Sequence, residues 1–149
     1  MINRCLSVTA CTLVFSVMTL ASAAGEEIGQ IKVLTGEVHI VRENVSQPAK
    51  TGDLLKQADT VVTGSESSVG ITFIDNSRFS AGPNSRIELK RFRFNPTTYD
   101  GHFLTELQRG TLAIISGEIA KHSPDGMKVR TRRTILGVRG TKFLIKVEE

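Results

Sequence analysis

Residues 71–79 are ITFIDNSRF, and this stretch has the pattern of a β-hairpin. Apolar and polar side chains alternate before Asp75-Asn76, and Arg78-Phe79 begins a second strand. Asparagine tolerates the left-handed backbone conformation that a tight hairpin turn requires. A period of two places every second side chain on one face of a sheet. This segment therefore predicts two antiparallel strands that share one buried face.

The same alternation recurs before and after the hairpin. Alternating runs occur at 38–40, 87–89 and 143–147, and turn formers such as Gly82-Pro83-Asn84 separate them. No apolar stripe with a period of 3.6 reaches helical length; 54–58 spans about one turn. The pattern predicts an all-β fold: a single-domain antiparallel sandwich, jelly-roll-like, with a short β-solenoid as the alternative.

Length and composition agree with one folded domain. The chain has 149 residues, of which 40% are hydrophobic and 23% charged. A domain commonly contains about 100–200 residues, so one core is expected. The apolar and charged fractions are ordinary for a globular protein, which excludes a wholly disordered chain.

The first 23 residues have the order of a secretory signal peptide. Arg4 is followed by an uncharged run from 5 to 20 and by Ala21-Ser22-Ala23, an A-x-A cleavage site. The apolar run is short and rich in Ser and Thr, whereas a membrane anchor needs about 18 or more apolar residues. We expect a signal peptide at 1–23, a β domain at 24–149, no transmembrane segment after cleavage, and a periplasmic protein.

A second processing route would lipidate Cys11, because Val8-Thr9-Ala10-Cys11 is similar to a lipobox. We favour cleavage after Ala23, since few apolar residues precede Cys11 and an intact apolar run follows it. That cleavage removes Cys5 and Cys11, the two cysteines of the chain. The mature protein then has no thiol nucleophile, zinc–thiolate site or redox pair.

The sequence shows no recognisable catalytic or metal-binding pattern. It contains no G-x-S-x-G nucleophile motif, no G-x-G-x-x-G or Walker pattern and no EF-hand spacing. His39, His102 and His122 do not have metal-ligand spacing. We therefore expect a non-enzymatic protein without a cofactor or a metal.

Cations gather near the carboxyl end. Residues 128–146 contain seven Lys or Arg and no acid, and a second cluster, Lys90, Arg91 and Arg93, lies before them. Alternation should place many of these on one positive face, or leave them as solvated strand faces with no partner. The candidate binding residues are Arg130, Arg132, Arg133, Arg139 and Lys142. Export disfavours nucleic acid, which leaves an acidic protein or an anionic envelope polymer as the partner.

Val129-Arg130-Thr131 followed by Gly137-Val138-Arg139-Gly140-Thr141-Lys142-Phe143 resembles the closing segment of the FecR family. This extracytoplasmic domain was first known from regulators of iron-citrate uptake. Earlier segments agree in order: 29–41 is similar to the opening strand pair, 51–64 to the Gly-Asp…Thr-Gly segment, and Asp75-Asn76-Ser77 to the usual Asp-Gly-Ser. The resemblance covers roughly residues 29–147.

The closing motif also has a structural interpretation. Gly137, Gly140 and Thr141 form its frame, and Gly140 is expected to permit a positive-φ bulge. We expect Arg139 to hydrogen-bond across strands or to pair with a buried acid such as Glu106 or Glu118.

Two departures from the family pattern limit what the resemblance implies. Thr131-Arg132-Arg133-Thr134 replaces the Thr-Pro-Xaa-Ala that often precedes the closing motif, which adds two cations. Regulatory members carry a cytoplasmic anti-sigma region and a membrane-crossing helix before this domain, and we expect neither here. The full role of a transmembrane regulator therefore does not transfer.

The resemblance implies a protein-interaction or regulatory and sensory module in the cell envelope. Such a module docks another envelope protein through β-edge pairing or through the basic surface. The alternative is binding of peptidoglycan or lipopolysaccharide through the basic carboxyl-terminal surface.

Overall fold

A computed structural model describes residues 25–140 and 142–148 of the chain. The expected signal peptide, with its cleavage site and the lipobox-like stretch, lies outside the described residues, as does Thr141. Among the residues that are described, no helix is long and apolar enough to cross a membrane.

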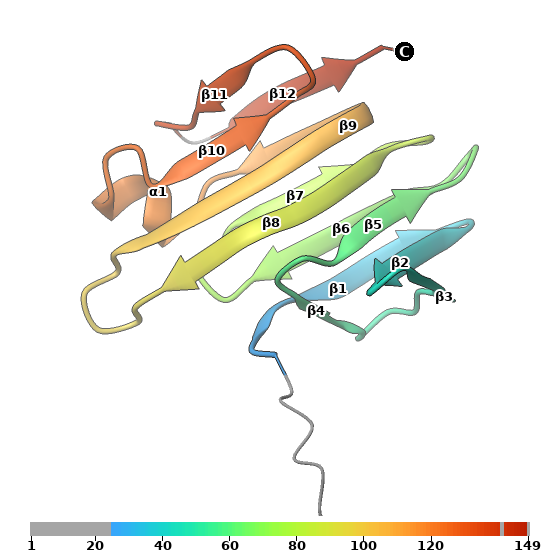
Figure 1. The fold of residues 1–149 in the computed structure, drawn as a ribbon, viewed down its shortest axis with the longest axis horizontal. Helices are drawn as coiled ribbons and strands as arrows, with labels where there is room; N and C mark the ends of the chain where they lie inside the picture. The colour runs from blue at the N-terminus through green and yellow to red at the C-terminus, as the bar shows by residue number, and fades with distance from the viewer. Residues whose placement is uncertain (1–24, 141, 149) are drawn as a thin grey trace, which may run out of the picture.

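Twelve strands and one short helix make up the described chain. The elements are β1 (Glu27–Thr35), β2 (Val38–Arg42), β3 (Val45–Pro48), β4 (Leu54–Lys56), β5 (Thr60–Thr63), β6 (Ser68–Phe73), β7 (Arg78–Ala81), β8 (Arg86–Phe94), β9 (Gly101–Ile115), α1 (Glu118–His122), β10 (Met127–Arg130), β11 (Ile135–Gly137) and β12 (Lys142–Val147). They form one curled sheet in the order β3-β2-β5-β8-β9-β7-β6-β1-β4, from which β10, β11 and β12 branch at β9 (Figure 1).

This architecture confirms the all-β prediction. Neighbouring strands are antiparallel except for β10, which runs parallel to β9. The β-solenoid alternative is wrong, because the coils of a solenoid stack their strands in parallel. The finer prediction of a jelly-roll-like sandwich is not confirmed, since the strands join in one continuous curled sheet.

The hairpin predicted at 71–79 is confirmed. Its two strands are β6 and β7, with Thr72 opposite Arg78 and Ile71 opposite Phe79. Asn76 has a φ of 64°, the left-handed conformation expected of the turn. The backbone closes the turn, because the amide of Phe73 donates to the carbonyl of Ser77 at 2.9 Å.

The central strand β9 belongs to both halves of the sheet: its first part pairs with strands of one half, and its last part pairs with strands of the other. Up to Arg109 it pairs with β8 on one edge and β10 on the other, and from Gly110 onward it pairs with β7 and β12. Gly110 has a φ of 91°, and a Cβ there would lie 2.2 Å from Ser85 Oγ. The Ser85 hydroxyl accepts a 3.0 Å hydrogen bond from the amide of Thr111. A glycine is therefore required where β9 passes from one half to the other.

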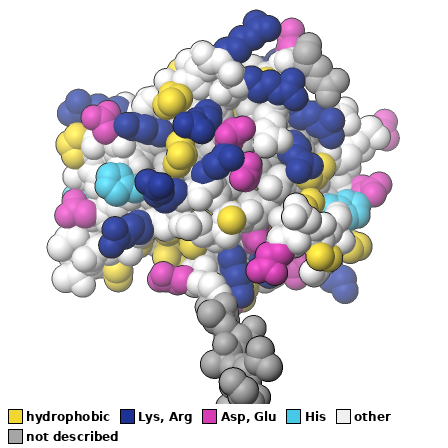
Figure 2. Space-filling view, viewed as in Figure 1, with side chains coloured by type: hydrophobic (Ala, Val, Ile, Leu, Met, Phe, Trp, Pro, Cys, Tyr) yellow, Lys and Arg dark blue, Asp and Glu magenta, His cyan; other side chains and the backbone are white. Residues whose placement is uncertain are grey.

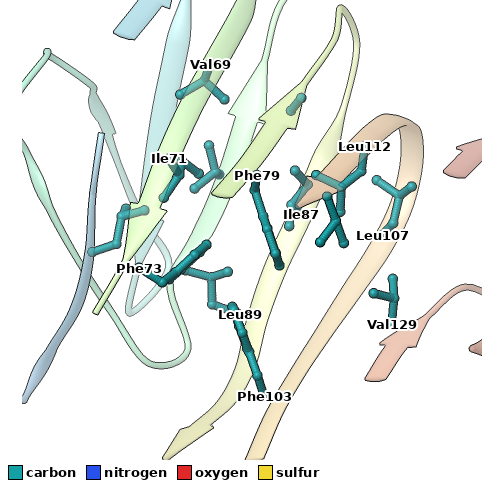
Figure 3. Close-up of a cluster of buried hydrophobic side chains, with 14 of the residues drawn as sticks. Val69, Ile71, Phe73, Phe79, Ile87, Leu89, Phe103, Leu107, Leu112 and Val129 are labelled. Carbon is teal, nitrogen blue, oxygen red and sulfur yellow. The ribbon is translucent and has the colours of Figure 1, made fainter. Parts of the chain in front are cut away.

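Side chains that alternate inward fill the space enclosed by the sheet. Figure 3 shows residues of β6, β7, β8, β9 and β10 pointing toward one another. Phenylalanine rings form its centre: Phe79 stacks on Phe103 with centroids 5.1 Å apart. Phe73 meets both rings edge-on at 4.7 Å. Such aromatic pairs add about 0.5–1.5 kcal/mol each beyond the burial of their area.

An ion pair closes the seam between the two ends of the sheet. Arg42, at the end of β2, binds Asp59, whose side chain is only 1% exposed. The same guanidinium donates from Nη2 to the carbonyl of Leu54 in β4, at 3.2 Å. The hydrogen bond to Asp59 raises the pKa of Arg42, and burial opposes the shift. The pair thus ties β2, which lies next to one end of the sheet order, to β4, which lies at the other end.

Candidate interaction surface at the carboxyl-terminal strands

A groove of about 790 Å³ lies between β11, β12 and the turn that joins β10 to β11. Its apolar side is formed by Leu136, Ile145 and Val147. Its charged side is mainly cationic: Arg132, Arg133 and Lys146 line it together with one acid, Glu148. Ile145 is buried, whereas Leu136 is 38% exposed and so remains accessible in the groove.

Two strand edges face solvent at this end of the molecule. Within 25–140 and 142–148, β11 pairs with β10 alone and β12 pairs with β9 alone. An unpaired edge offers a row of backbone donors and acceptors to another chain. The groove therefore lies between two edges that can each accept an added strand.

A tight turn presents the two arginines of the groove. The amide of Thr131 donates to the carbonyl of Thr134 at 2.8 Å, and the amide of Thr134 donates to Thr131 Oγ1 at 3.2 Å. These bonds fix the turn at 131–134. Arg132 and Arg133 occupy its tip and are exposed.

Hydrogen bonds outside the strand ladders help to anchor the closing motif. Val138 is buried, and its amide donates to the carbonyl of Met127 in β10 at 2.9 Å. Ser116, directly after β9, donates from Oγ to the carbonyl of Gly140. The motif is thus held against the ends of β9 and β10, while Thr141 is outside the described part of the chain.

Neither glycine of the motif is required by the fold itself. Gly140 does not have a positive φ, so the expected bulge there is wrong. A Cβ added at Gly137 or at Gly140 would meet nothing within 4 Å. Both positions leave bare backbone open to solvent, and Gly137 ends β11, whose outer edge is free. Glycine in such a place permits the close approach of another backbone.

The expected ion pair of Arg139 is also wrong. Arg139 is exposed, and none of the described acids forms an ion pair with it. Glu106 lies instead 3.4 Å from the Lys90 ammonium, and Glu118 lies 2.9 Å from that of Lys121. Strand register brings Lys90 of β8 to Glu106 of β9, whereas Lys121 lies one turn after Glu118 in α1.

The predicted basic residues do not share one face. Lys128 and Arg130 point outward from β10, opposite the buried Met127 and Val129. In the parallel pairing of β10 with β9, Arg130 lies beside Glu106. The outer face of β10 therefore belongs to a surface that also carries acids.

Lys142 and Lys146 belong to a different face. They point outward from β12, and β12 pairs with the last part of β9 rather than with β10. Arg132 and Arg133 lie at the turn on the groove between the two branches. Figure 2 looks onto the side where β8 is in front, and there Asp and Glu side chains lie among the Lys and Arg side chains near the centre.

The second cationic cluster is partly neutralised. The Lys90 ammonium lies 3.0 Å from Glu88 and 3.4 Å from Glu106, and the hydrogen bond to Glu88 raises the pKa of Lys90. Arg91 and Arg93 are exposed, while Phe92 between them packs into the core. The cluster on β8 is therefore a mixed-charge surface and not a purely positive one.

Asp75 has a structural role, away from the groove. Its carboxylate is buried and accepts from the amide of Ser77 at 3.1 Å and from the Ser77 hydroxyl at 2.7 Å. Ser77 Oγ in turn accepts from the amide of Gly117 at 3.0 Å, which joins the hairpin turn to the start of α1. Burial raises the pKa of Asp75, although these hydrogen bonds oppose the shift.

One exposed apolar residue went unrecognised as a site residue. Leu144 is 68% exposed, between Lys142 and Lys146 on the outer face of β12. The alternation at 143–147 already placed it outward, because Phe143, Ile145 and Val147 occupy the inward positions. A leucine at an outward position of an edge strand was the available signal.

The described residues contain no group of three or more His, Cys, Asp or Glu side chains that could hold a metal ion. The family model described as FecR protein matches residues 59–149. No curated protein and no solved structure matches the chain. The strands before the matched segment belong to the same sheet, since β1 pairs with β6 and β2 pairs with β5.

Proposed function

The chain belongs to the FecR family, and from this premise we propose that it is a regulatory or sensory interaction module of the cell envelope. It is a non-enzymatic domain that recognises another envelope protein and takes part in signal transduction through that contact. The signal-peptide pattern at 1–23 supports export to the periplasm. The regulatory character of the family supports an interaction role over catalysis.

The groove between β11 and β12 is the observation that carries this proposal. It combines two free strand edges, an apolar side and a cationic side at one end of the molecule. Gly137 and Gly140, whose backbone is open to solvent, lie in the segment that joins β11 to β12. A protein partner uses all of these features, because added strands bond to the edge and their side chains enter the groove.

In-cell crosslinking tests the proposal. A tagged full-length protein is crosslinked in the envelope, and mass spectrometry identifies what co-purifies and reads the mature amino terminus. We expect one dominant envelope protein and a mature chain that begins at Ala24. Arg132→Glu, Arg133→Glu and Lys146→Glu together should weaken its capture, because these three cations line the groove.

A matched variant controls for net charge. Lys50, Arg91 and Arg93 are exposed cations away from the groove, and their replacement by Glu changes the charge by the same amount. Capture should survive in this control. Equal loss in both variants would show that net charge, and not the groove, controls the interaction.

The exposed arginines support a second candidate function, the binding of an anionic envelope polymer. Arg132 and Arg133 have no ion-pair partner among the described acids, so polyanions have access to them. Binding to peptidoglycan sacculi or to lipopolysaccharide would be strongly weakened by salt, because the Debye length falls to about 8 Å at 0.15 M. Cosedimentation at low salt, without a specific protein in the crosslinking experiment, would favour this candidate.

A further inference from the structure

The free edge of β12 carries a defined chemical pattern. Lys142, Leu144 and Lys146 point outward, and Phe143, Ile145 and Val147 alternate with them toward the interior. Lysines commonly protect an edge strand from unwanted pairing. That protection does not account for a leucine that is 68% exposed between them. The outer face of the strand is thus cationic at both ends and apolar in the middle.

Neighbouring strands extend this charge pattern. Ile115 of β9 lies opposite Lys142 on one side and opposite Arg78 of β7 on the other. Both cations therefore flank one exposed apolar side chain. The outward positions of β7, β12 and the β9 segment from Thr111 to Ile115 contain no carboxylate.

One acid lies just beyond β12. The Lys146 ammonium is 2.8 Å from Glu148, and the two side chains are 66% and 78% exposed. A pair this exposed is screened by water and exchanges readily. It leaves Lys146 available to a better-placed carboxylate on an added strand.

Among the described strands, none lies beyond the free edge of β12 on its interior side either. Ile145 and Val147 line the groove together with Leu136 of β11. A strand added to the free edge would place its inward side chains over this apolar surface. Apolar residues at those positions would be buried, at about 25 cal/mol for each Å² removed from water.

A second copy of the chain fits this edge poorly. Antiparallel pairing of two β12 strands around Leu144 would place Lys142 of each copy opposite Lys146 of the other. Like charges directly opposite each other destabilise a strand pair. Pairing of two β12 edges is therefore disfavoured by charge repulsion, and a strand with negative charges is favoured instead.

We propose that β12 pairs with an extended segment of the partner protein that has acidic residues four positions apart and apolar residues between them. The two acids lie opposite Lys142 and Lys146, and the central apolar residue lies opposite Leu144. The two remaining side chains enter the groove. This inference rests on the proposed function and assigns the chemistry of the segment that the module recognises.

Synthetic peptides with the exported protein test the pattern. One peptide has the core Glu-Val-Leu-Val-Glu, a second replaces both Glu by Lys, and a third carries the Glu core with N-methyl groups on the edge-facing amides. We expect the Glu peptide to bind and the Lys peptide to bind about tenfold more weakly, because two cross-strand charge pairs change sign. The N-methyl peptide should not bind, since it retains the charge but cannot pair with the edge.

A charge swap provides the decisive variant. Lys142→Glu with Lys146→Glu should reverse the preference, so that the Lys peptide binds better than the Glu peptide. Arg91→Glu with Arg93→Glu makes the same change in net charge on β8 and should keep the original preference. Unchanged preference in the β12 variant, or equal binding of the N-methyl peptide, would overturn the inference.

Two further outcomes separate this inference from the proposed function. If crosslinking captures the same envelope protein equally well with the β12 charge swap, the acidic-strand inference fails and the interaction module stands. If no protein is captured by the wild-type chain, the proposed function itself fails. Preferential binding to vesicles of anionic phospholipid, without discrimination between the peptides, would also overturn the acidic-strand inference.

Discussion

Arg42 holds Asp59 by two hydrogen bonds, from Nε to Oδ1 at 2.8 Å and from Nη2 to Oδ2 at 2.7 Å. The amide of Lys56 donates to the same Oδ2 at 2.8 Å, so the buried carboxylate collects contacts from two ends of the sheet. A buried carboxylate without its cation is strongly unfavourable. The pair therefore sets the geometry of the seam between β2 and β4.

Arg42→Met should destabilise the protein by about 2–3 kcal/mol, because it leaves the Asp59 charge buried without its cation. The loss is moderated because the Arg42 side chain is partly exposed and solvent screens the pair. Urea unfolding followed by circular dichroism measures this change. Lys121→Met removes an exposed pair with Glu118 and should change stability by less than about 0.5 kcal/mol. Equal effects of the two substitutions would contradict a special role for the seam.

Gly117→Ala should destabilise the fold by about 3 kcal/mol or more, because a new Cβ would lie 2.1 Å from the Asp75 carbonyl oxygen and 2.4 Å from the Ser77 amide nitrogen. Thermal unfolding of the purified protein would reveal the loss. Gly140→Ala is the matched control, since its Cβ would meet nothing within 4 Å. The control should leave the melting temperature unchanged or slightly higher.

The raised pKa of Asp75 predicts a specific pH dependence. Its contribution to stability is complete below the unfolded-state pKa, about 3.9, and is lost as pH rises through the higher folded-state pKa. Asp75→Asn removes this titration. The stability of the wild type relative to Asp75→Asn should therefore fall across that window and remain constant above it.

Urea titrations of both proteins between pH 3 and 8 provide the test. Other carboxylates titrate in the same range, but they do so in both proteins and cancel in the difference. Parallel stability curves would show that the Asp75 carboxyl has the same proton affinity in the folded and unfolded chain.

Lys142→Thr with Lys146→Thr should promote self-association through β12. The change removes the like-charge opposition and places two residues of high strand propensity beside the exposed Leu144. Sedimentation velocity should show a dimer whose population increases with concentration. Lys50→Thr with Lys121→Thr should sediment as the wild type does, and increased dimerisation of both variants would contradict the assignment to this edge.

Local signals in the sequence were sufficient for the hairpin at 71–79 and for the strand at 143–147, but not for β4, where 54–58 was the nearest approach to a helix, nor for the short helix α1. The turn at Asp75-Asn76 and the alternation at 143–147 both predicted the observed structure because hairpin pairing and side-chain direction depend on near neighbours. The family resemblance likewise located the closing segment, which the family match at 59–149 includes.

The positions of the charged residues on the surface depend on which distant strands pair and in what register. Arg130 and Lys142 were expected on one positive face, but β10 pairs with the first part of β9 and β12 with its last part. Glu106 was likewise expected near Arg139, whereas the pairing of β8 with β9 brings Lys90 to it. These contacts follow from which strands are neighbours, and alternation alone does not specify that.

The placement of β9 has a consequence for how the protein opens. Four strands bond to it, β7, β8, β10 and β12, so both halves of the sheet lose hydrogen bonds when β9 unfolds. Separation of an edge strand such as β12 leaves the pairs of β9 with β8 and β10 in place. We therefore expect the amides of β9 to be among the slowest of the domain to exchange with deuterium, because this strand is paired along both of its edges.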